Sequence, residues 1–147
     1  MAKIVIIGGG FGGLSFLQNA RKSKNEFVLI DRTNHHLFQP LLYQVATAVL
    51  SPADITVPLR NLFKNDKNVR TILGEVKEIN REIKEITLDS KEIVSYDKLI
   101  ISAGSSYSYF GNNEWAKFSK GLKVINDALD IREKILKAFE KAENEKD

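Results

Sequence analysis

The segment Lys3-Ile4-Val5-Ile6-Ile7-Gly8-Gly9-Gly10-Phe11-Gly12-Gly13 decides the fold. Its first five residues are mostly β-branched and apolar on both faces, which is typical of a strand in a parallel sheet covered on both sides. Apolar residues at helical spacing follow the glycines, and a second apolar run, Phe27–Ile30, ends at Asp31. A strand, a glycine turn, a helix and a second strand within about 30 residues form one βαβ unit. The sequence therefore predicts an α/β fold of the Rossmann-like kind with a parallel sheet.

The glycines form the pattern Gly8-x-Gly10-x-x-Gly13, a dinucleotide-binding fingerprint when it joins a buried strand to a helix. In that motif the first glycine permits a tight turn, the second lets a pyrophosphate approach the backbone, and the third lets the helix pack closely on the strand. Unpaired N–H groups at the helix start favour the anionic phosphates. Asp31, 18 residues after Gly13, is placed to accept hydrogen bonds from ribose hydroxyls and disfavours a 2′-phosphate. Dinucleotide binding follows, although the motif alone does not separate FAD from NAD.

The rest of the chain predicts an insertion and a return to the sheet. Apolar residues alternate with charged ones from Val69 to Tyr96, which indicates a half-exposed antiparallel meander of three strands. The apolar run Leu99–Ile101 then predicts another strand of the parallel sheet, and it stops at Ala103-Gly104. We expect one domain over residues 1–125 and an amphipathic helix over 126–147, capped by Asn126. One face of that helix carries Leu129, Arg132, Ile135, Leu136 and Phe139.

Composition excludes several classes of protein. The net charge of +3 is small and evenly spread, which argues against nucleic-acid binding, and no apolar run is long enough to span a membrane. The 147 residues contain no Cys, so a disulfide framework, a thiolate metal site and a cysteine nucleophile are excluded. We expect no metal site at the adjacent residues His35 and His36, no secretory leader, and a cytoplasmic setting.

The order of these features resembles the FAD domain of flavoprotein oxidoreductases with two dinucleotide-binding domains. Ser102-Ala103-Gly104 stands where that superfamily often has Ala-Thr-Gly after a strand. Within the superfamily, three segments are similar to type II NADH dehydrogenases: the run from Asp31 to Thr47 (DRTNHHLFQPLLYQVAT), Ser51–Ile55 (SPADI) and Ser108–Gly111 (SYFG). The resemblance covers essentially the whole chain.

The resemblance implies an enzyme that passes a hydride from NADH to FAD and then two electrons to a quinone at the membrane. It implies contacts with the FAD pyrophosphate from the glycine turn and from the end of the Leu99–Ile101 strand, and contacts with the adenosine half from Asp31, Arg32 and Val76. The segment Leu42–Thr47 would approach the flavin half. The implied cofactor-binding residues are Gly8, Gly10, Phe11, Gly12, Gly13, Asp31, Arg32, Leu42, Val76, Ala103 and Gly104. No residue is assigned as a catalytic acid, base or nucleophile.

Members of that family are about three times as long, so the fold is expected to be incomplete relative to the full two-dinucleotide-domain fold. An NADH-binding domain, the quinone site and the amphipathic membrane anchor would lie outside these residues, and peripheral membrane association would depend on them. The chain could be a fragment, a truncated gene product or a split subunit with a partner chain or a second copy. We expect the isolated chain to bind FAD weakly or not at all and not to turn over NADH. Two alternatives stay open: a short NAD-dependent dehydrogenase, and a non-catalytic nucleotide-binding or subunit module.

Overall fold

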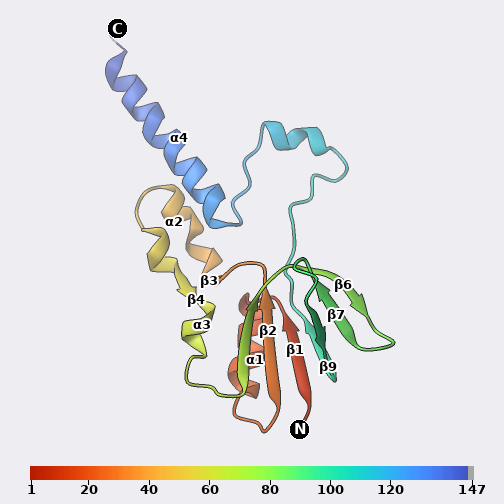
Figure 1. Ribbon diagram of the computed structural model, residues 1–147. Helices are drawn as coiled ribbons and strands as arrows, with labels where there is room; N and C mark the ends of the chain where they lie inside the picture. Colours follow the sequence, from red (N-terminus) through yellow and green to blue (C-terminus); the bar gives the residue numbers. More distant parts are fainter. Residues whose placement is uncertain (146–147) are drawn as a thin grey trace. The chain divides into compact units, whose positions relative to one another are not determined.

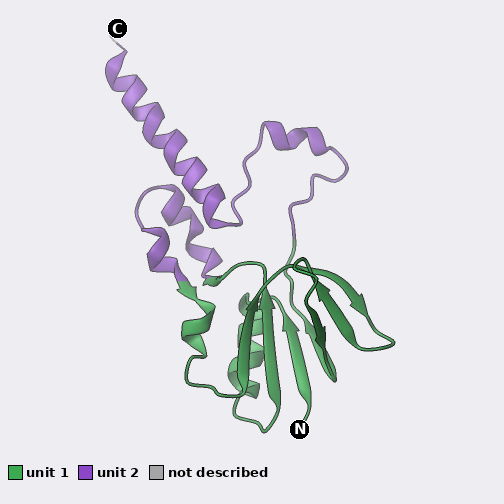
Figure 2. Cartoon of the chain, viewed as in Figure 1, with its two compact units in different colours: residues 1–36, 57–105 green, residues 37–56, 106–147 purple. Residues whose placement is uncertain are grey.

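The computed structural model describes residues 1–145 and divides into two compact units (Figure 2). The first unit comprises Met1–His36 and Val57–Ser105. The second comprises Leu37–Thr56 and the described part of residues 106–147. Each unit has its own apolar core, and each is considered by itself.

A four-stranded parallel sheet forms the centre of the first unit (Figure 1). Its strands run in the order β5 (Val69–Leu73), β2 (Glu26–Asp31), β1 (Lys3–Ile7) and β9 (Lys98–Ile101). In register, Ile4 of β1 lies between Phe27 of β2 and Lys98 of β9. The two strands predicted at the start of the chain and the predicted return of Leu99–Ile101 to the parallel sheet are confirmed.

Both faces of this sheet are covered, which explains the unbroken apolar runs. Alternate residues of a strand point to opposite faces. Ile4 and Ile6 pack with helix α1 (Phe11–Ala20) and the short helix α3 (Leu59–Leu62), whereas Val5 and Ile7 pack with an antiparallel sheet on the other face. The first unit therefore has three layers, with the parallel sheet between helices and a smaller sheet.

The antiparallel meander is present, but it begins later than the predicted position Val69. It consists of β6 (Val76–Asn80), β7 (Glu85–Leu88) and β8 (Ile93–Ser95). Val69–Leu73 belongs instead to the parallel sheet as β5, paired with β2 from Phe27↔Val69 to Asp31↔Leu73. The alternation of exposed and buried residues misled the prediction because β5 lies at the edge of its sheet, where a parallel strand is also half exposed.

The remaining elements are short, apart from one helix. Strands β3 (His35–Leu37) and β4 (Thr56–Pro58) form a two-stranded sheet. The others are the 3-10 turns η1 (Gln39–Leu41), η2 (Pro52–Ile55) and η3 (Asn113–Lys117) and the helices α2 (Leu42–Ala46) and α4 (Ile125–Asn144). In the second unit, α2 and α4 pack together around Leu42, Val45, Ala46, Ile55 and Ala128.

Helix α4 differs from its prediction in its cap and in its packed face. It begins at Ile125, and the cap predicted at Asn126 is wrong: the carboxylate of Asp127 accepts hydrogen bonds from the N–H groups of Lys123 (2.8 Å) and Val124 (3.0 Å). The packed face carries Ile125, Ala128 and Ile131. The apolar members of the predicted stripe are exposed instead, with Phe139 at 68% exposure. The partner helix α2 has only five residues, so it can cover only about two turns of α4.

Asp127 links the start of α4 to the preceding loop, since its Oδ2 also accepts a hydrogen bond from the hydroxyl of Tyr107. Burial raises the pKa of Asp127, but the hydrogen bonds from Tyr107 and from the two backbone N–H groups outweigh burial and lower it below its ordinary value. Burial, followed by the hydrogen bond to the carboxylate, raises the pKa of Tyr107. The charged carboxylate is therefore favoured in the folded state.

We expect Asp127→Asn to lower the free energy of unfolding by about 1 kcal/mol at neutral pH, because the neutral amide is a weaker acceptor at a helix start. A group with a lowered pKa contributes stability above its unfolded pKa of 3.8 and loses it as pH falls through the folded pKa. The difference from the parent chain should therefore shrink below about pH 4. Urea unfolding across a pH series measures it. Asp130→Asn is the control, because the exposed carboxylate of Asp130 has only Nζ of Lys120, 3.9 Å from its Oδ2, as an ion-pair partner within residues 1–145. Equal losses of unfolding free energy in both variants would contradict the role of Asp127 at the helix start.

Candidate dinucleotide-binding site

The candidate residues of the first unit converge on one edge of the parallel sheet. Strands β1, β2 and β9 are parallel, so their carboxyl ends meet at the same edge. Gly8 follows β1, Asp31 ends β2, and Ser102 follows β9. This edge is the usual ligand position in open α/β sheets.

The first and third glycines of the motif are required by close backbone contacts. Gly8 has φ +101°, and a Cβ on it would lie 2.3 Å from the carbonyl oxygen of Ser102. A Cβ on Gly13 would lie 1.9 Å from the carbonyl oxygen of Gly8. The tight turn at Gly8 and the close packing of the helix at Gly13 are therefore confirmed as features of the structure.

Gly10 has a different environment, because a Cβ on it would meet no atom within 4 Å. It caps α1 in an extended conformation (φ −76°, ψ −165°), and the first helical bond runs from the N–H of Leu14 to the carbonyl of Gly10 (3.0 Å). The N–H groups of the first helical turn have no carbonyl partner within the helix. Open space beside Gly10 at the start of a helix suits an anionic diphosphate.

Asp31 is held by three donors of its own chain. Its Oδ2 accepts the N–H of Gly9 at 2.5 Å, and its Oδ1 accepts both the N–H and the hydroxyl of Thr33 at 2.7 Å each. A carboxylate offers about four lone-pair positions, so about one remains for a ligand. The carboxylate predicted to hold the ribose thus also fixes the glycine turn.

Ser102 ties β9 to the same turn. Its N–H donates to the carbonyl of Ile7 (2.8 Å), and its Oγ lies 2.9 Å from that carbonyl oxygen and 3.0 Å from the carbonyl oxygen of Gly8. Ala103 and Gly104 follow, and Gly104 has φ +75°, which glycine adopts without strain. The segment in place of Ala-Thr-Gly therefore keeps its turn and makes side-chain hydrogen bonds through serine.

Five further predicted residues lie at separate positions in the chain. Phe11 and Gly12 start helix α1, and Arg32 is exposed directly after β2. Val76 starts β6, two residues after Gly74, whose N–H donates to the carbonyl of Asp31 (2.9 Å). Leu42 belongs to the second unit, where its side chain is 1% exposed in the apolar cluster beside α4. Its side chain is thus enclosed by protein, and its contact with the flavin half stays a prediction.

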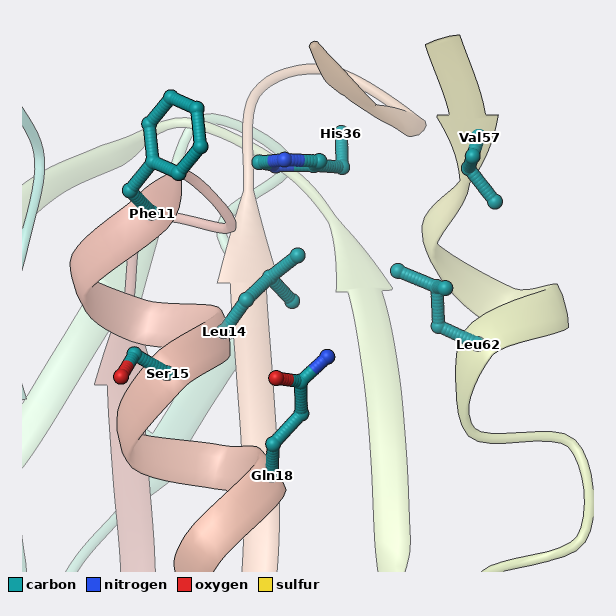
Figure 3. Close-up of a pocket in the computed structure, with 7 residues that line it drawn as sticks. All are labelled: Phe11, Leu14, Ser15, Gln18, His36, Val57 and Leu62. Atoms are coloured by element: carbon teal, nitrogen blue, oxygen red, sulfur yellow. The ribbon is translucent and has the colours of Figure 1, made fainter. Parts of the chain in front are cut away.

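The sequence favoured a cofactor-bordering loop for one of the two histidines without saying which, and in the structure it is His36 that lies against the glycine turn. Its Nδ1 lies 3.1 Å from the carbonyl oxygen of Gly9, and its ring meets that of Phe11 edge to face with 5.1 Å between centroids. Both rings border a cavity of about 260 Å³ between α1 and the segment from β4 to α3, shown in Figure 3. The other residues that line it are Leu14, Ser15, Gln18, Val57 and Leu62.

Residues 1–145 contain no group of three or more His, Asp or Glu side chains placed to hold a metal ion. Within the same residues, no helix has the length and apolarity needed to cross a membrane.

The sequence matches the family model of the pyridine nucleotide-disulphide oxidoreductases over residues 2–142. The chain belongs to this family. Its 147 residues hold no Cys, so they cannot carry a redox-active dithiol.

Within this family, the chain is similar to several quinone oxidoreductases. Two type II NADH:quinone oxidoreductases of Mycobacterium tuberculosis, Ndh and NdhA, are 44% and 47% identical to the chain, over 99% and 96% of its length. The structure of NDH2 from Plasmodium falciparum in complex with NADH is 34% identical with a TM-score of 0.84 and covers 96% of the chain. The sulfide:quinone oxidoreductase from Aquifex aeolicus also reaches a TM-score of 0.84, at 25% identity and 95% coverage. The resemblance to type II NADH dehydrogenases is confirmed.

These matches cover a minor part of the relatives. The chain spans 32% of Ndh and 31% of NdhA, and 30% of the NDH2 structure. About two thirds of the length of each relative thus has no counterpart in these 147 residues.

Proposed function

We propose that the chain is the FAD-binding part of an NADH:quinone oxidoreductase of the type II kind. The observation that carries the proposal is the glycine turn, where open space beside Gly10 lies at the start of helix α1 and the N–H of Gly9 is held by Asp31. Similarity to type II enzymes favours FAD over NAD in this site, and it makes the short NAD-dependent dehydrogenase the weaker alternative.

The chain's own residues would bind and orient the cofactor. The amides of the first turn of α1 would bind the diphosphate, Asp31 would accept ribose hydroxyls, and Val76 would lie beside the adenine. The bound flavin would supply the redox chemistry, since protein groups around a flavin provide position and electrostatics. Residues 1–125 would hold this site, and the helix after them would lead toward an NADH-binding domain.

Activity of the whole enzyme would require more chain than these residues. The edge strand β9 leaves Ile101 66% exposed, and α4 leaves Phe139 68% exposed. Apolar surface of this kind favours association with further protein, either a continuation of the same chain or a partner chain. We place the complete enzyme at the cytoplasmic face of a membrane, with the membrane contact made by other residues.

The sequence leaves open whether the isolated chain binds FAD at all, but the glycine turn is formed in this chain, so we expect weak, saturable binding of FAD and no NADH-dependent reduction of a dye. Weak binding follows because only the adenosine and diphosphate half of the cofactor meets residues of the first unit. Titration with FAD, followed by flavin fluorescence, measures affinity, and dye reduction with NADH measures turnover. Absence of saturable binding would overturn the proposed cofactor site, and robust turnover would overturn the inferred incompleteness.

A further inference from the structure

The peptide group between Gly9 and Gly10 lies at the centre of the glycine turn. Its carbonyl belongs to Gly9 and its N–H to Gly10, and in a trans peptide these two groups point in opposite directions. Anything that holds the carbonyl of Gly9 therefore sets the direction of the N–H of Gly10. That N–H belongs to the one motif glycine that borders open space on its Cβ side.

The side chain of His36 is placed to hold this carbonyl. Its Nδ1 lies 3.1 Å from the oxygen of Gly9, and a carbonyl can only accept, so Nδ1 must carry the proton. The ring is half-buried and packs edge to face on Phe11 at an interplanar angle of 89°, which fixes its orientation. Figure 3 shows both rings at the start of helix α1.

The other peptide group of Gly9 is held as well. Its N–H donates to the carboxylate of Asp31, so side chains from the end of β2 and from β3 hold the two peptide groups of one glycine. Both contacts join residues more than 20 positions apart in the sequence. The turn is thus oriented by long-range side chains in addition to its own glycines.

We propose that His36 is a positioning residue of the diphosphate site. By donating from Nδ1 to the carbonyl of Gly9, it orients the Gly9–Gly10 peptide so that the N–H of Gly10 is presented to the diphosphate of the dinucleotide. The proposal rests on the proposed function for the identity of FAD, but not for the hydrogen bond itself.

The neighbouring histidine provides a matched control. The Nδ1 of His35 lies 3.0 Å from the side-chain oxygen of Asn34, an exposed residue, and so faces a different partner from that of His36. Replacing His35 by Phe changes the same residue type, one position away, without touching the carbonyl of Gly9.

The first test needs no cofactor. Nitrogen-edited NMR of the imidazole groups at alkaline pH distinguishes the two tautomers of a neutral histidine. We expect His36 to carry its proton on Nδ1. A proton on Nε2 of His36 overturns the proposal whatever the chain binds.

The second test compares ligands and variants. We expect His36→Phe, which keeps a ring but loses the donor, to lower the affinity for FAD, ADP and inorganic pyrophosphate by about threefold to tenfold. This is the contribution of one hydrogen bond. His36→Asn, whose amide can donate from near the Nδ1 position, should restore affinity to within about twofold of the parent. His35→Phe should leave the affinity for each ligand unchanged. The affinity for adenosine, which lacks phosphates, should be the same in the parent and in every variant.

The outcomes separate the two proposals. A lower affinity for adenosine as well as for the phosphate-containing ligands would indicate that the ring is merely structural and overturn the positioning role. Equal losses of affinity in His36→Phe and His36→Asn would do the same. A chain that binds pyrophosphate with this variant pattern but not FAD would overturn the proposed cofactor and leave the role of His36 standing. A parent chain that binds neither ligand would overturn both.

Discussion

Replacing Gly13 by alanine is expected to lower the free energy of unfolding by about 3 kcal/mol or more. The new methyl group would lie 1.9 Å from the carbonyl oxygen of Gly8 and 2.8 Å from Oγ of Ser102, and the first of these is backbone that cannot rotate away. Relief would require α1 to move from β1, which would disturb the core residues Leu14 and Leu17. Urea unfolding followed by circular dichroism measures the loss.

Gly10→Ala is the matched control within the same motif, because its methyl group would meet no protein atom within 4 Å. We expect its free energy of unfolding to stay within about 1 kcal/mol of the parent, since Gly10 already has a negative φ that alanine adopts. Its affinity for FAD should fall about tenfold, because the methyl group occupies the space of the diphosphate.

If Gly13→Ala lowers the free energy of unfolding and Gly10→Ala lowers only the affinity for FAD, then Gly13 is required for stability and Gly10 for binding. A stable Gly13→Ala chain would show that helix and strand are less tightly packed than the structure has them. A Gly10→Ala chain with unchanged affinity for FAD, ADP and pyrophosphate would show that the diphosphate binds elsewhere.

The sequence predicted the parts of this fold that local patterns determine. The unbroken apolar runs of β1 and β2 indicated strands covered on both faces, and the apolar run of β9 indicated a return to the parallel sheet. The spacing of glycines after β1 indicated the turn and the helix. Each of these patterns arises within a few residues, so it is visible without knowledge of the partners.

The parts it did not predict depend on distant partners. The edge strand β5 has the same alternation as a meander strand, and only its pairing with β2 identifies it. The packed face of α4 depends on the short length of α2, and the contact of His36 with Gly9 spans 27 positions in the sequence. Residue type and spacing carry no information on such contacts, which is why the partners of His36 and Ser102 in the glycine turn are known only from the structure.

Asp31→Asn is expected to lower the affinity for FAD and ADP by about tenfold to 100-fold, the contribution of one charge-assisted hydrogen bond to a ribose hydroxyl. The amide offers one acceptor oxygen in place of two, while the N–H of Gly9 and the two donors of Thr33 still compete for it. The affinity for inorganic pyrophosphate, which lacks ribose, should fall by less, because the amide oxygen can still accept the N–H of Gly9. The affinity for ADP carrying a 2′-phosphate should rise relative to the affinity for ADP, because the carboxylate charge that repels the 2′-phosphate is lost.

Thr33→Ala tests whether the ribose must compete for Asp31. Thr33 supplies two of the three donors on this carboxylate, and the substitution removes the hydroxyl but keeps the N–H. We therefore expect Thr33→Ala to bind ADP at least as tightly as the parent, in contrast to Asp31→Asn. Calorimetric titration of both variants with ADP and with pyrophosphate provides the comparison. Equal weakening of ADP and pyrophosphate by Asp31→Asn would mean that this carboxylate acts only by holding Gly9, and that the ribose is bound by other residues.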